Sequence, residues 1–481
     1  MIGVIPAAGK GTRAYPYTKN MPKGMLKING KPLLHNTISI MRDKLKISDI
    51  YIIVSQMSES IIRDYFGDGS DMNVRLTYVK NNNLEKGLAY SVLLAKDFVK
   101  DYCCVMLSDE YYLNSNHDEL AASDFHNSYI TCLVKENSRI KEIRRNYNVV
   151  VDGDKVTALI EKPEHAATDI LGCGTWILHR DFMYDLKKEF EDNVDCDGNL
   201  VAIMDKLCKR KLIKSFKLKG EYININSRDE INKANNITRT HLFNSSKISL
   251  IMIVENENNL AHLISDYYSE NIIDEIVLVS RNPLGAAKEF TEKFGKVVVL
   301  PSPPSITQYG EKIKYGMENA TGDIFIITPS DDSFSPKDLR KLLTYICEAD
   351  MVVGTRTTRE MIEQGTNMNT FVRIVSYLLA RTIELLWYDR KVRITDVGCI
   401  YRALWKNTFY EIRDSIESKG PELITEMLIE LLERRMRIIE IPVSYCNTTD
   451  EHHINLPNRT LGMFFRLVVL IGKKIYFKRK R

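Results

Sequence analysis

A glycine-rich turn is the first part of the chain whose residue types could do chemistry. The string AAGKGTR follows the first apolar run, and Lys23 stands close behind it. Gly9 and Gly11 permit positive φ and a close approach of the backbone to a ligand. Successive N–H groups in such a turn form a cradle for an anion, and Arg13 and Lys23 add two cations. The turn predicts a phosphate-rich ligand, although it contains neither a P-loop Gly-Lys-Ser/Thr nor a GxGxxG string.

Carboxylates that follow apolar runs are the second such feature. Asp109 follows the string CCVMLS, and Asp331 and Asp332 follow IFIITPS. Carboxylate oxygens are hard ligands that suit Mg²⁺ (or Mn²⁺), and a divalent ion beside phosphate groups neutralises their charge. The sequence therefore predicts one divalent metal site in each half of the chain.

Apolar runs alternate with stretches of helical periodicity, and this alternation must position those residues. Strands are expected at residues 2–5, 50–54, 74–79 and 103–107, with helices at 33–45, 61–66 and 87–99. Strands begin again at 248–254, 276–279, 297–300, 324–327 and 351–353. Such alternation predicts a parallel, doubly wound sheet that binds ligands at the carboxyl ends of its strands. The expected fold class is α/β, with two consecutive Rossmann-like α/β/α domains.

The length and one polar stretch set the expected domain boundaries. A chain of 481 residues exceeds what one hydrophobic core usually supports. The string NNITRTHLFNSSK at 235–247 is polar and poorly periodic. We predict a first domain at 1–238, a linker at 239–247, and a second domain at 248–481 that ends in an amphipathic and basic tail.

Composition excludes several classes of protein. The net charge is +4, from 67 basic and 63 acidic residues, so nucleic acid is not an expected partner. Nine Cys are scattered without metal-binding spacing, which favours the reducing cytoplasm. The chain opens with a core strand, so no signal peptide is expected, and no apolar run reaches the roughly 20 residues of a membrane span.

Two stretches near the C-terminus are candidates for a membrane surface. On a helical wheel of residues 371–388, Arg373, Arg381 and Glu384 fall within about 80° of one another, and the rest is apolar. A second apolar stretch at 461–471 precedes a tail in which six of the last nine residues are Lys or Arg. The pattern favours peripheral attachment to the inner face of the cell membrane, while packing in the core or in a dimer interface stays open.

The string G-x-G-T-R followed by Pro-Lys resembles the sugar-phosphate nucleotidyltransferases. So do YFGDG at 65–69, GLA at 87–89, EKP at 161–163 and GCG at 172–174. The resemblance covers residues 1–240 and implies transfer of a nucleotidyl group from an NTP to a sugar 1-phosphate, with release of pyrophosphate. It implies a catalytic role for Arg13, Lys23 and Asp109. It implies nucleotide binding by Ala8, Gly9, Gly11, Thr12, Asn82 and Gly87, sugar-phosphate binding by Glu161, Lys162 and Gly174, and metal binding by Asp109 and Asn224.

The resemblance leaves two assignments open: the second metal ligand and the base of the nucleotide. Asn224 stands where the family usually has an Asp, and an amide oxygen is also a ligand for magnesium. The GLA string favours a pyrimidine NTP. However, SVLLAKDF at 91–98 is similar to CTP-dependent enzymes that act on choline phosphate or other alcohol phosphates, so that alternative stays open.

Strings in the second half resemble family-two glycosyltransferases with the GT-A fold, of the dolichyl-phosphate mannose synthase type. They are VENENNL at 254–260, ATGD at 320–323, SDD at 330–332, VGTR at 353–356 and DVGCIYR at 396–402. The resemblance implies a nucleotide-sugar donor and a polyprenyl-phosphate or glycan acceptor. It implies donor binding by Asn256 and Glu257, metal binding by Asp331 and Asp332, and catalysis by Asp331 with Asp396 as the base for a hydroxyl acceptor.

Together these strings predict a bifunctional enzyme that makes a nucleotide sugar and then transfers its sugar. Three family features are absent: V-D-D-G-S is replaced by a string that begins VSRN, the first Asp of D-x-D is Pro329, and the late R-x-x-G-x-S-K string reads NTTDEHH at 447–453. A second domain that is a non-catalytic membrane anchor is therefore the alternative.

Overall fold

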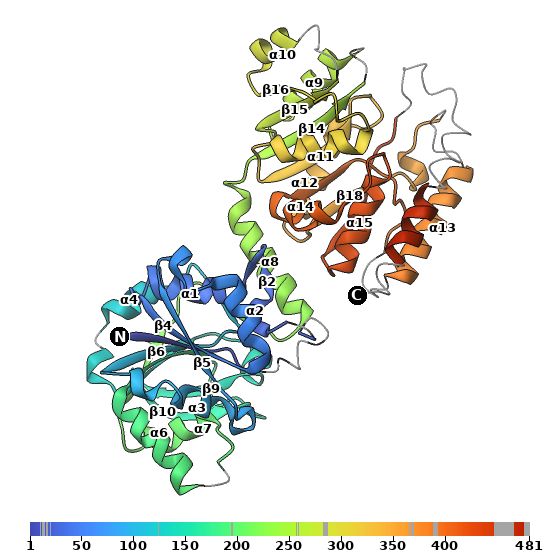
Figure 1. The fold of residues 1–481 in the computed structure, drawn as a ribbon. Helices are drawn as coiled ribbons and strands as arrows, with labels where there is room; N and C mark the ends of the chain where they lie inside the picture. Colours follow the sequence, from blue (N-terminus) through green and yellow to red (C-terminus); the bar gives the residue numbers. More distant parts are fainter. Residues whose placement is uncertain are drawn as a thin grey trace. The chain divides into compact units, whose positions relative to one another are not determined.

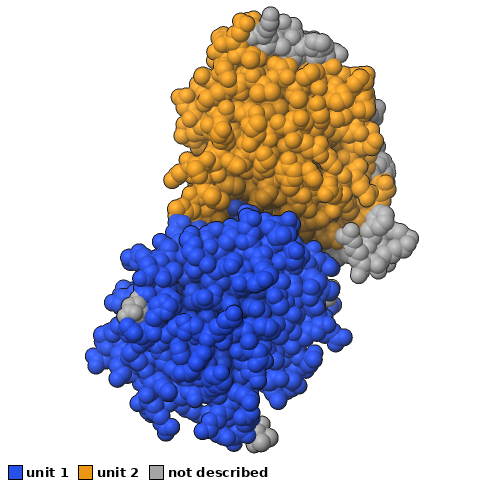
Figure 2. All heavy atoms as spheres, turned by 60° about the vertical axis from the view of Figure 1, so that its left-hand side comes forward, with its two compact units in different colours: residues 1–234 blue, residues 235–481 orange. Residues whose placement is uncertain are grey.

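The computed structural model divides the chain into two compact units, Met1–Ala234 and Asn235–Arg481 (Figure 1, Figure 2). Each unit has a central β-sheet with helices packed against it. The structure describes residues 1–9, 11, 15, 18–19, 21–123, 125–193, 196–255, 257, 259–281, 287–364, 366, 370–387, 393–446 and 466–475.

A nine-stranded mixed sheet is the centre of the first unit. Its strands are β1 (Ile2–Pro6), β4 (Asp49–Val54), β5 (Arg75–Lys80), β6 (Tyr102–Met106), β8 (Ile130–Lys135), β9 (Tyr147–Asp152), β10 (Lys155–Glu161), β11 (Leu171–His179) and β12 (Ile213–Lys217). Their order is β5-β4-β1-β6-β11-β8-β12-β10-β9. The first four are parallel, as the sequence predicts, but β11 runs antiparallel to both β6 and β8. The sheet is therefore mixed, and the tight turn at Gly153 between β9 and β10 permits only an antiparallel pair.

Helices cover both faces of this sheet because successive side chains of a strand point to opposite faces. Ile5 of β1 packs in one apolar cluster with Leu34 and Ile38, whereas its neighbour Val4 packs in another with Ala89 and Val92. The helices are α1 (Leu33–Asp43), α2 (Gln56–Phe66), α3 (Gly87–Leu93), α4 (His117–Ala122), α5 (Ile140–Ile143), α6 (Arg180–Asp192) and α7 (Leu200–Cys208). Two small antiparallel sheets pair β2 (Lys27–Ile28) with β3 (Lys31–Pro32) and β7 (Glu110–Leu113) with β13 (Glu221–Asn224).

Helix α8 (Arg228–Phe243) passes through the boundary between the two units. The linker predicted at 239–247 therefore begins inside a helix. Arg239 is buried, forms an ion pair with Asp350, and lies over the ring of Trp405 at 5.8 Å. The hydrophobic pattern of the sequence does not indicate this helix, because one of its buried positions is an arginine. An arginine is normally expected at a solvent-exposed position.

A seven-stranded mixed sheet is the centre of the second unit. Its strands are β14 (Ile248–Val254), β15 (Glu275–Ser280), β16 (Val297–Pro301), β17 (Ile324–Pro329), β18 (Met351–Thr355), β19 (Arg402–Trp405) and β20 (Ile438–Pro442). Their order is β16-β15-β14-β17-β19-β18-β20, and β19 is antiparallel to β17 and β18. The five strands predicted in this half are all present.

Helices of the second unit also bury the sheet. All seven residues of β14 are buried, as expected for a central strand covered on both faces. The helices are α9 (Leu260–Ser269), α10 (Ala287–Phe294), α11 (Tyr309–Asn319), α12 (Leu339–Ile346), α13 (Thr370–Leu386), α14 (Lys406–Ile412) and α15 (Leu423–Glu433), and residues 466–475 are helical too. Within the described residues, no helix is long and apolar enough to span a membrane.

Candidate active sites

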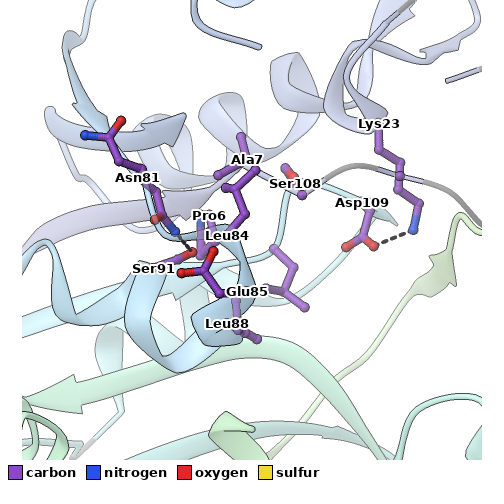
Figure 3. Close-up of a pocket in the computed structure, with 16 residues that line it drawn as sticks. Pro6, Ala7, Lys23, Asn81, Leu84, Glu85, Leu88, Ser91, Ser108 and Asp109 are labelled. Carbon is purple, nitrogen blue, oxygen red and sulfur yellow. Dashed lines mark hydrogen bonds and ion pairs between the residues drawn. The ribbon is translucent and has the colours of Figure 1, made fainter. Parts of the chain in front are cut away.

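A cavity of about 710 Å³ opens at the carboxyl ends of β1 and β6 in the first unit (Figure 3). The turn after β1, the segment from Asn81 to Ser91, and Ser108 with Asp109 after β6 line it. Because β1 and β6 are parallel neighbours, their carboxyl ends meet at the same edge of the sheet. The cavity therefore lies where a doubly wound sheet binds its ligands.

Most of the predicted nucleotide-binding residues line this cavity. Thr12 and Arg13 lie outside the described residues. Gly11 has a φ of 63°, and its carbonyl oxygen accepts a 2.7 Å hydrogen bond from the Thr18 hydroxyl, which fixes the turn. The residues that the structure brings to the cavity are Ala8, Gly9, Gly11, Asn82 and Gly87.

A buried asparagine shapes the opposite wall. The side-chain Nδ2 of Asn81 donates a 2.9 Å hydrogen bond to the Ser91 hydroxyl, and its Oδ1 accepts a 2.8 Å hydrogen bond from the Asn83 N–H. This anchoring leaves Asn82 exposed at the cavity. Gly87 has a φ of 71°, and a Cβ there would lie 2.6 Å from a backbone oxygen, so a side chain does not fit.

Lys23 is the centre of a polar group at the edge of the cavity. Its Nζ lies 2.5 Å from Asp109 Oδ2 and 2.9 Å from Asn226 Oδ1. The lysine is 9% exposed, so its ammonium depends on these partners for solvation. Figure 3 shows the Lys23 and Asp109 side chains pointing toward each other. One cation thus holds two oxygen ligands together.

A chain of asparagines continues from this centre. Asn226 Nδ2 donates 2.8 Å to Asn224 Oδ1, and Asn224 Nδ2 donates 2.5 Å to Asn146 Oδ1. Strand β13 ends at Asn224, and the next N–H, that of Ile225, donates 2.9 Å to the Asp109 carbonyl. Asn226 therefore reaches Lys23, whereas Asn224, the predicted ligand, is one step removed. Sequence reasoning named neither Asn226 nor Asn146, although all three asparagines have the same chemistry.

The oxygens around Lys23 fit a divalent cation. Asp109 and Asn226 direct a carboxylate and an amide oxygen at one point, where a positive charge already stands. Magnesium accepts such ligands and fills its remaining positions with water and substrate phosphates. Among the described residues, no three or more His, Cys, Asp or Glu side chains are grouped so that they could hold a metal ion.

The predicted sugar-phosphate residues lie at the end of β10, where Lys162 follows Glu161, and in β11. Lys162 Nζ pairs with Glu161 Oε1 at 2.9 Å. Lys162 has a φ of 41°, and its N–H donates 2.8 Å to the Asn146 carbonyl. This bond connects the EKP segment to the asparagine chain. Gly174 lies in β11 where its register against β8 shifts.

Glu110 is a buried carboxylate that sequence reasoning missed. It is 1% exposed, and its oxygens accept hydrogen bonds from Tyr222 (2.6 Å), Tyr112 (2.6 Å) and the Gly174 N–H (2.9 Å). Burial, and then the charge of Asp109, raise the pKa of Glu110 to about 7. The available signal was a glutamate inside the aromatic strand EYYL, where a charge is unusual.

The carboxylates of the second unit follow β17. Asp331 Oδ1 accepts a 3.1 Å hydrogen bond from the Ser333 N–H and another from its hydroxyl. Because β14 and β17 are parallel neighbours, with Ile253 paired with Pro329, Asp331 lies at the same sheet edge as the end of β14, where Glu257 follows. Asp332 is partly exposed beside it, and Asn256 lies outside the described residues.

Asp396, predicted as the base for a hydroxyl acceptor, is held by a dense set of hydrogen bonds. It is 0% exposed and forms a bidentate ion pair with Arg356, at 2.7 Å from Nε and 3.0 Å from Nη2. The N–H groups of Arg356 and Gly398 also donate to it at 3.1 Å. Burial would raise its pKa, but Arg356 outweighs burial and the pKa of Asp396 is lowered. The Asp396 carboxylate is thus held as the charged partner of Arg356.

The two halves match different enzyme families. The nucleotidyl transferase family matches residues 2–226, and glycosyl transferase family 2 matches residues 249–404. UTP–glucose-1-phosphate uridylyltransferase AglF of Haloferax volcanii is 31% identical over 176 residues, which are 36% of this chain and 70% of that protein. The chain belongs to the nucleotidyl transferase family. The match to the nucleotidyl transferase family lies in the first unit, and the match to glycosyl transferase family 2 lies in the second.

A second relative aligns with a larger share of this chain but with a smaller share of its own length. The bifunctional protein GlmU of Methanocaldococcus jannaschii is 28% identical over 239 residues, which are 49% of this chain and 53% of GlmU. The chain therefore spans about half the length of the GlmU relatives that it matches. A crystal structure of UDP-glucose pyrophosphorylase complexed with UDP-glucose aligns with 50% of this chain and 100% of that one, at a TM-score of 0.44 and 20% identity.

Proposed function

We propose that the first unit transfers a nucleotidyl group from an NTP to a sugar 1-phosphate and releases pyrophosphate. The observation that supports this most is the convergence of Lys23, Asp109 and Asn226 at the edge of the cavity. Two anionic substrates must meet there, and such a reaction depends on charge neutralisation and alignment more than on acid–base chemistry.

In the proposed reaction, an oxygen of the sugar phosphate attacks the α-phosphorus of the NTP. A new P–O bond forms, the bond from the α-phosphorus to the bridging oxygen breaks, and pyrophosphate leaves with that electron pair. A bound Mg²⁺ (or Mn²⁺) would supply charge neutralisation at the phosphates, and Asp109 with Asn226 or Asn224 would hold it. Lys23 orients Asp109 and adds positive charge, while the N–H groups around Gly9 and Gly11 hold the triphosphate. Arg13 adds a second cation, and Glu161, Lys162 and Gly174 bind the sugar phosphate.

A pyrimidine NTP is the favoured nucleotide. Asn82 is held at the cavity by the Asn81 anchor, and Gly87 lines the same cavity. AglF, named for UTP and glucose 1-phosphate, supports the same choice. The alternative is CTP with an alcohol phosphate.

The test of the first proposal is pyrophosphate release by the purified chain with Mg²⁺. Each common NTP is crossed with a panel of sugar 1-phosphates and with choline and inositol phosphates. One strongly preferred pair of a pyrimidine NTP and a sugar 1-phosphate supports the proposal. Release with CTP and an alcohol phosphate alone selects the alternative, and no release with any pair contradicts both.

We propose that the second unit transfers the sugar from a nucleotide sugar to a lipid phosphate, such as a polyprenyl phosphate, or to a glycan. Asp331 at the carboxyl end of β17 supports this, because a strand-end carboxylate near the diphosphate can hold a divalent ion. Transfer of labelled sugar by the full chain, and its loss in Asp331→Asn, tests the proposal. If the wild type transfers nothing, the second unit is better explained as an anchoring module.

An exposed apolar face on α13 supports attachment to a membrane surface. Phe371, Ile374, Leu378 and Leu385 are 54–77% exposed and share one side of the helix. Arg381 on the same helix pairs with Glu384.

Residues 388 and 476–481, which complete the predicted surface and basic tail, lie outside the described residues, as do 461–465. We place the chain in the cytoplasm, peripherally on the inner face of the cell membrane, and all nine cysteines are free in keeping with that compartment.

Flotation with liposomes tests this surface. The full chain is mixed with vesicles of neutral lipid or with vesicles that contain anionic lipid. We expect wild type to float with anionic vesicles, and the double variant Leu378→Glu and Leu385→Glu to stay at the bottom. Ile140→Glu is the matched control, because Ile140 is an equally exposed apolar residue of the first unit. Flotation of the double variant like wild type would contradict the proposal.

A further inference from the structure

The first unit contains a buried carboxylate that has no role in the proposed binding of substrate or metal. Glu110 begins β7 directly after Asp109, and it is 1% exposed. A buried carboxylate is costly unless its oxygens are satisfied, so its partners indicate what it is for. Those partners come from three different strands.

The first partner is the backbone of β11 at Gly174. The register of β11 against β8 shifts between Gly172 and Trp176, which interrupts the hydrogen bonding between these strands. The Gly174 N–H donates to both oxygens of Glu110, at 2.9 Å each. A Cβ at Gly174 would lie 2.7 Å from Glu110 Oε1, so the glycine permits this approach. Glu110 therefore holds the irregular part of the strand that is predicted to contact the sugar phosphate.

The second partner is Tyr222 in β13, whose hydroxyl donates 2.6 Å to Glu110 Oε1. Tyr222 lies two residues before Asn224, and Asn224 is paired with Glu110 itself in the antiparallel ladder. The position of Tyr222 thus sets where the asparagines at the end of β13 stand. The third partner, Tyr112, lies in the same strand as Glu110, donates 2.6 Å to Oε2, and also contacts Thr175 Oγ1 at 2.9 Å.

We propose that Glu110 is a positioning residue that holds the sugar-phosphate side of the site in register with Asp109. One side chain ties the start of β7 to the bulge at Gly174 and to the strand that ends at Asn224. Its described hydrogen bonds reach neither the turn after β1 nor the segment from Asn81 to Gly87, which form the nucleotide side. Loss of Glu110 therefore weakens sugar-phosphate binding while NTP binding stays nearly unchanged. This inference rests on the proposed function of the first unit.

The experiment compares Glu110→Gln with wild type in the pyrophosphate-release assay, using the substrate pair that wild type turns over fastest. An amide has the same shape but one acceptor oxygen instead of two. We expect the KM for the sugar phosphate to rise about tenfold and the KM for the NTP to change less than about twofold. Tyr222→Phe should shift the same KM by a smaller factor. Tyr78→Phe is the matched control, because its hydroxyl donates 2.8 Å to the Gly67 carbonyl elsewhere in the unit and its loss should change neither KM.

Hydrogen exchange separates this inference from the proposed function. In Glu110→Gln we expect faster exchange in peptides that cover 171–176 and 221–226, with peptides that cover β1 and β4 unchanged. This readout needs no substrate, so it applies even if wild type releases no pyrophosphate and the proposed function fails. Equal rises of both KM values, or unchanged KM values with unchanged exchange in both segments, would overturn the positioning role.

Discussion

The two units place acidic residues at the same edge of similar sheets but use them differently. In the first unit, Asp109 faces a cavity of about 710 Å³ and shares Lys23 with Asn226. In the second, Asp396 is fully buried and bound to Arg356. A carboxylate at this edge of the sheet is therefore no sufficient sign of a reactive site, because its partners decide whether it faces a ligand or holds the fold.

The difference extends to the groups that surround each carboxylate. At the cavity edge, Asp109 pairs with the Lys23 ammonium, which also donates to the Asn226 amide oxygen. Around Asp396 the neighbours are an arginine, two backbone N–H groups and, through Thr395 and the backbone, Glu440. The first arrangement suits charged substrates that come and go, and the second suits a permanent structural pair.

The largest expected effect is a loss of pyrophosphate release by the first unit alone. Asp109→Asn removes the carboxylate that Lys23 and the proposed metal share, and we expect kcat for pyrophosphate release to fall about 1,000-fold, or about 4 kcal/mol in the activation barrier. Asp331→Asn should leave pyrophosphate release unchanged and should reduce sugar transfer. The assay is pyrophosphate release under saturating substrates. Full activity of Asp109→Asn would remove Asp109 from the proposed mechanism.

The next effect concerns stability in the second unit. Asp396→Asn leaves Arg356, whose side chain is only 18% exposed, without its ionic partner, and breaking a buried pair costs about 3–5 kcal/mol of unfolding free energy. Asp414→Asn is the control, because Asp414 is 85% exposed, pairs with Arg413 at 3.4 Å, and should contribute less than about 1 kcal/mol. Denaturant titration followed by Trp fluorescence measures both, since Trp387 and Trp405 lie in the second unit. Equal stability of the two variants would contradict a structural role for Asp396.

Local patterns made much of the fold predictable from the sequence. Strands such as β1, β6 and β14 are short apolar runs, and the turn at Gly9 and Gly11 follows the first of them at the ligand-binding edge. Such features depend on residues that are neighbours in the sequence, so the sequence alone predicts them. The boundary at α8 was missed because the helix buries Arg239, which pairs with Asp350 across 111 residues of sequence.

Within the sites, pairings over long sequence distance also decide what each residue contacts. Asn224 and Asn226 are two positions apart and chemically identical, and only the ladder of β13 with β7 decides which of them reaches Lys23. Asp396 looks like a free carboxylate until Arg356, forty residues away, is placed beside it. Glu110 was overlooked because its partners lie on β11 and β13. Pairings over long sequence distance, rather than residue types, separate a reactive group from a structural one.

A pH effect sharpens the comparison further. Burial raises the pKa of Glu440 to about 7 from an ordinary value of 4.5. The folded protein therefore keeps a proton that the unfolded chain releases near pH 4.5, so the free energy of unfolding falls as pH rises from about 4.5 to 7. The expected loss is roughly 3 kcal/mol. Glu440→Gln should flatten this slope in denaturant titrations of the second unit at pH 5, 6, 7 and 8, whereas an unchanged slope would assign it to other groups.

The smallest expected effect compares two glycines. A Cβ built at Gly9 meets no described atom within 4 Å and its φ is not left-handed, whereas a Cβ at Gly316 of α11 would lie 2.8 Å from Ile251 and 2.9 Å from Val279. Gly9→Ala should therefore keep the melting temperature within about 1 °C and raise the KM for the NTP about tenfold, or about 1.4 kcal/mol, because the methyl group occupies space meant for phosphate. Gly316→Ala should cost about 1–3 kcal/mol of stability through overpacking and leave that KM unchanged. If Gly9→Ala leaves the KM unchanged as well, the turn after β1 does not hold the triphosphate, and the first unit loses the feature that most distinguishes it from the second.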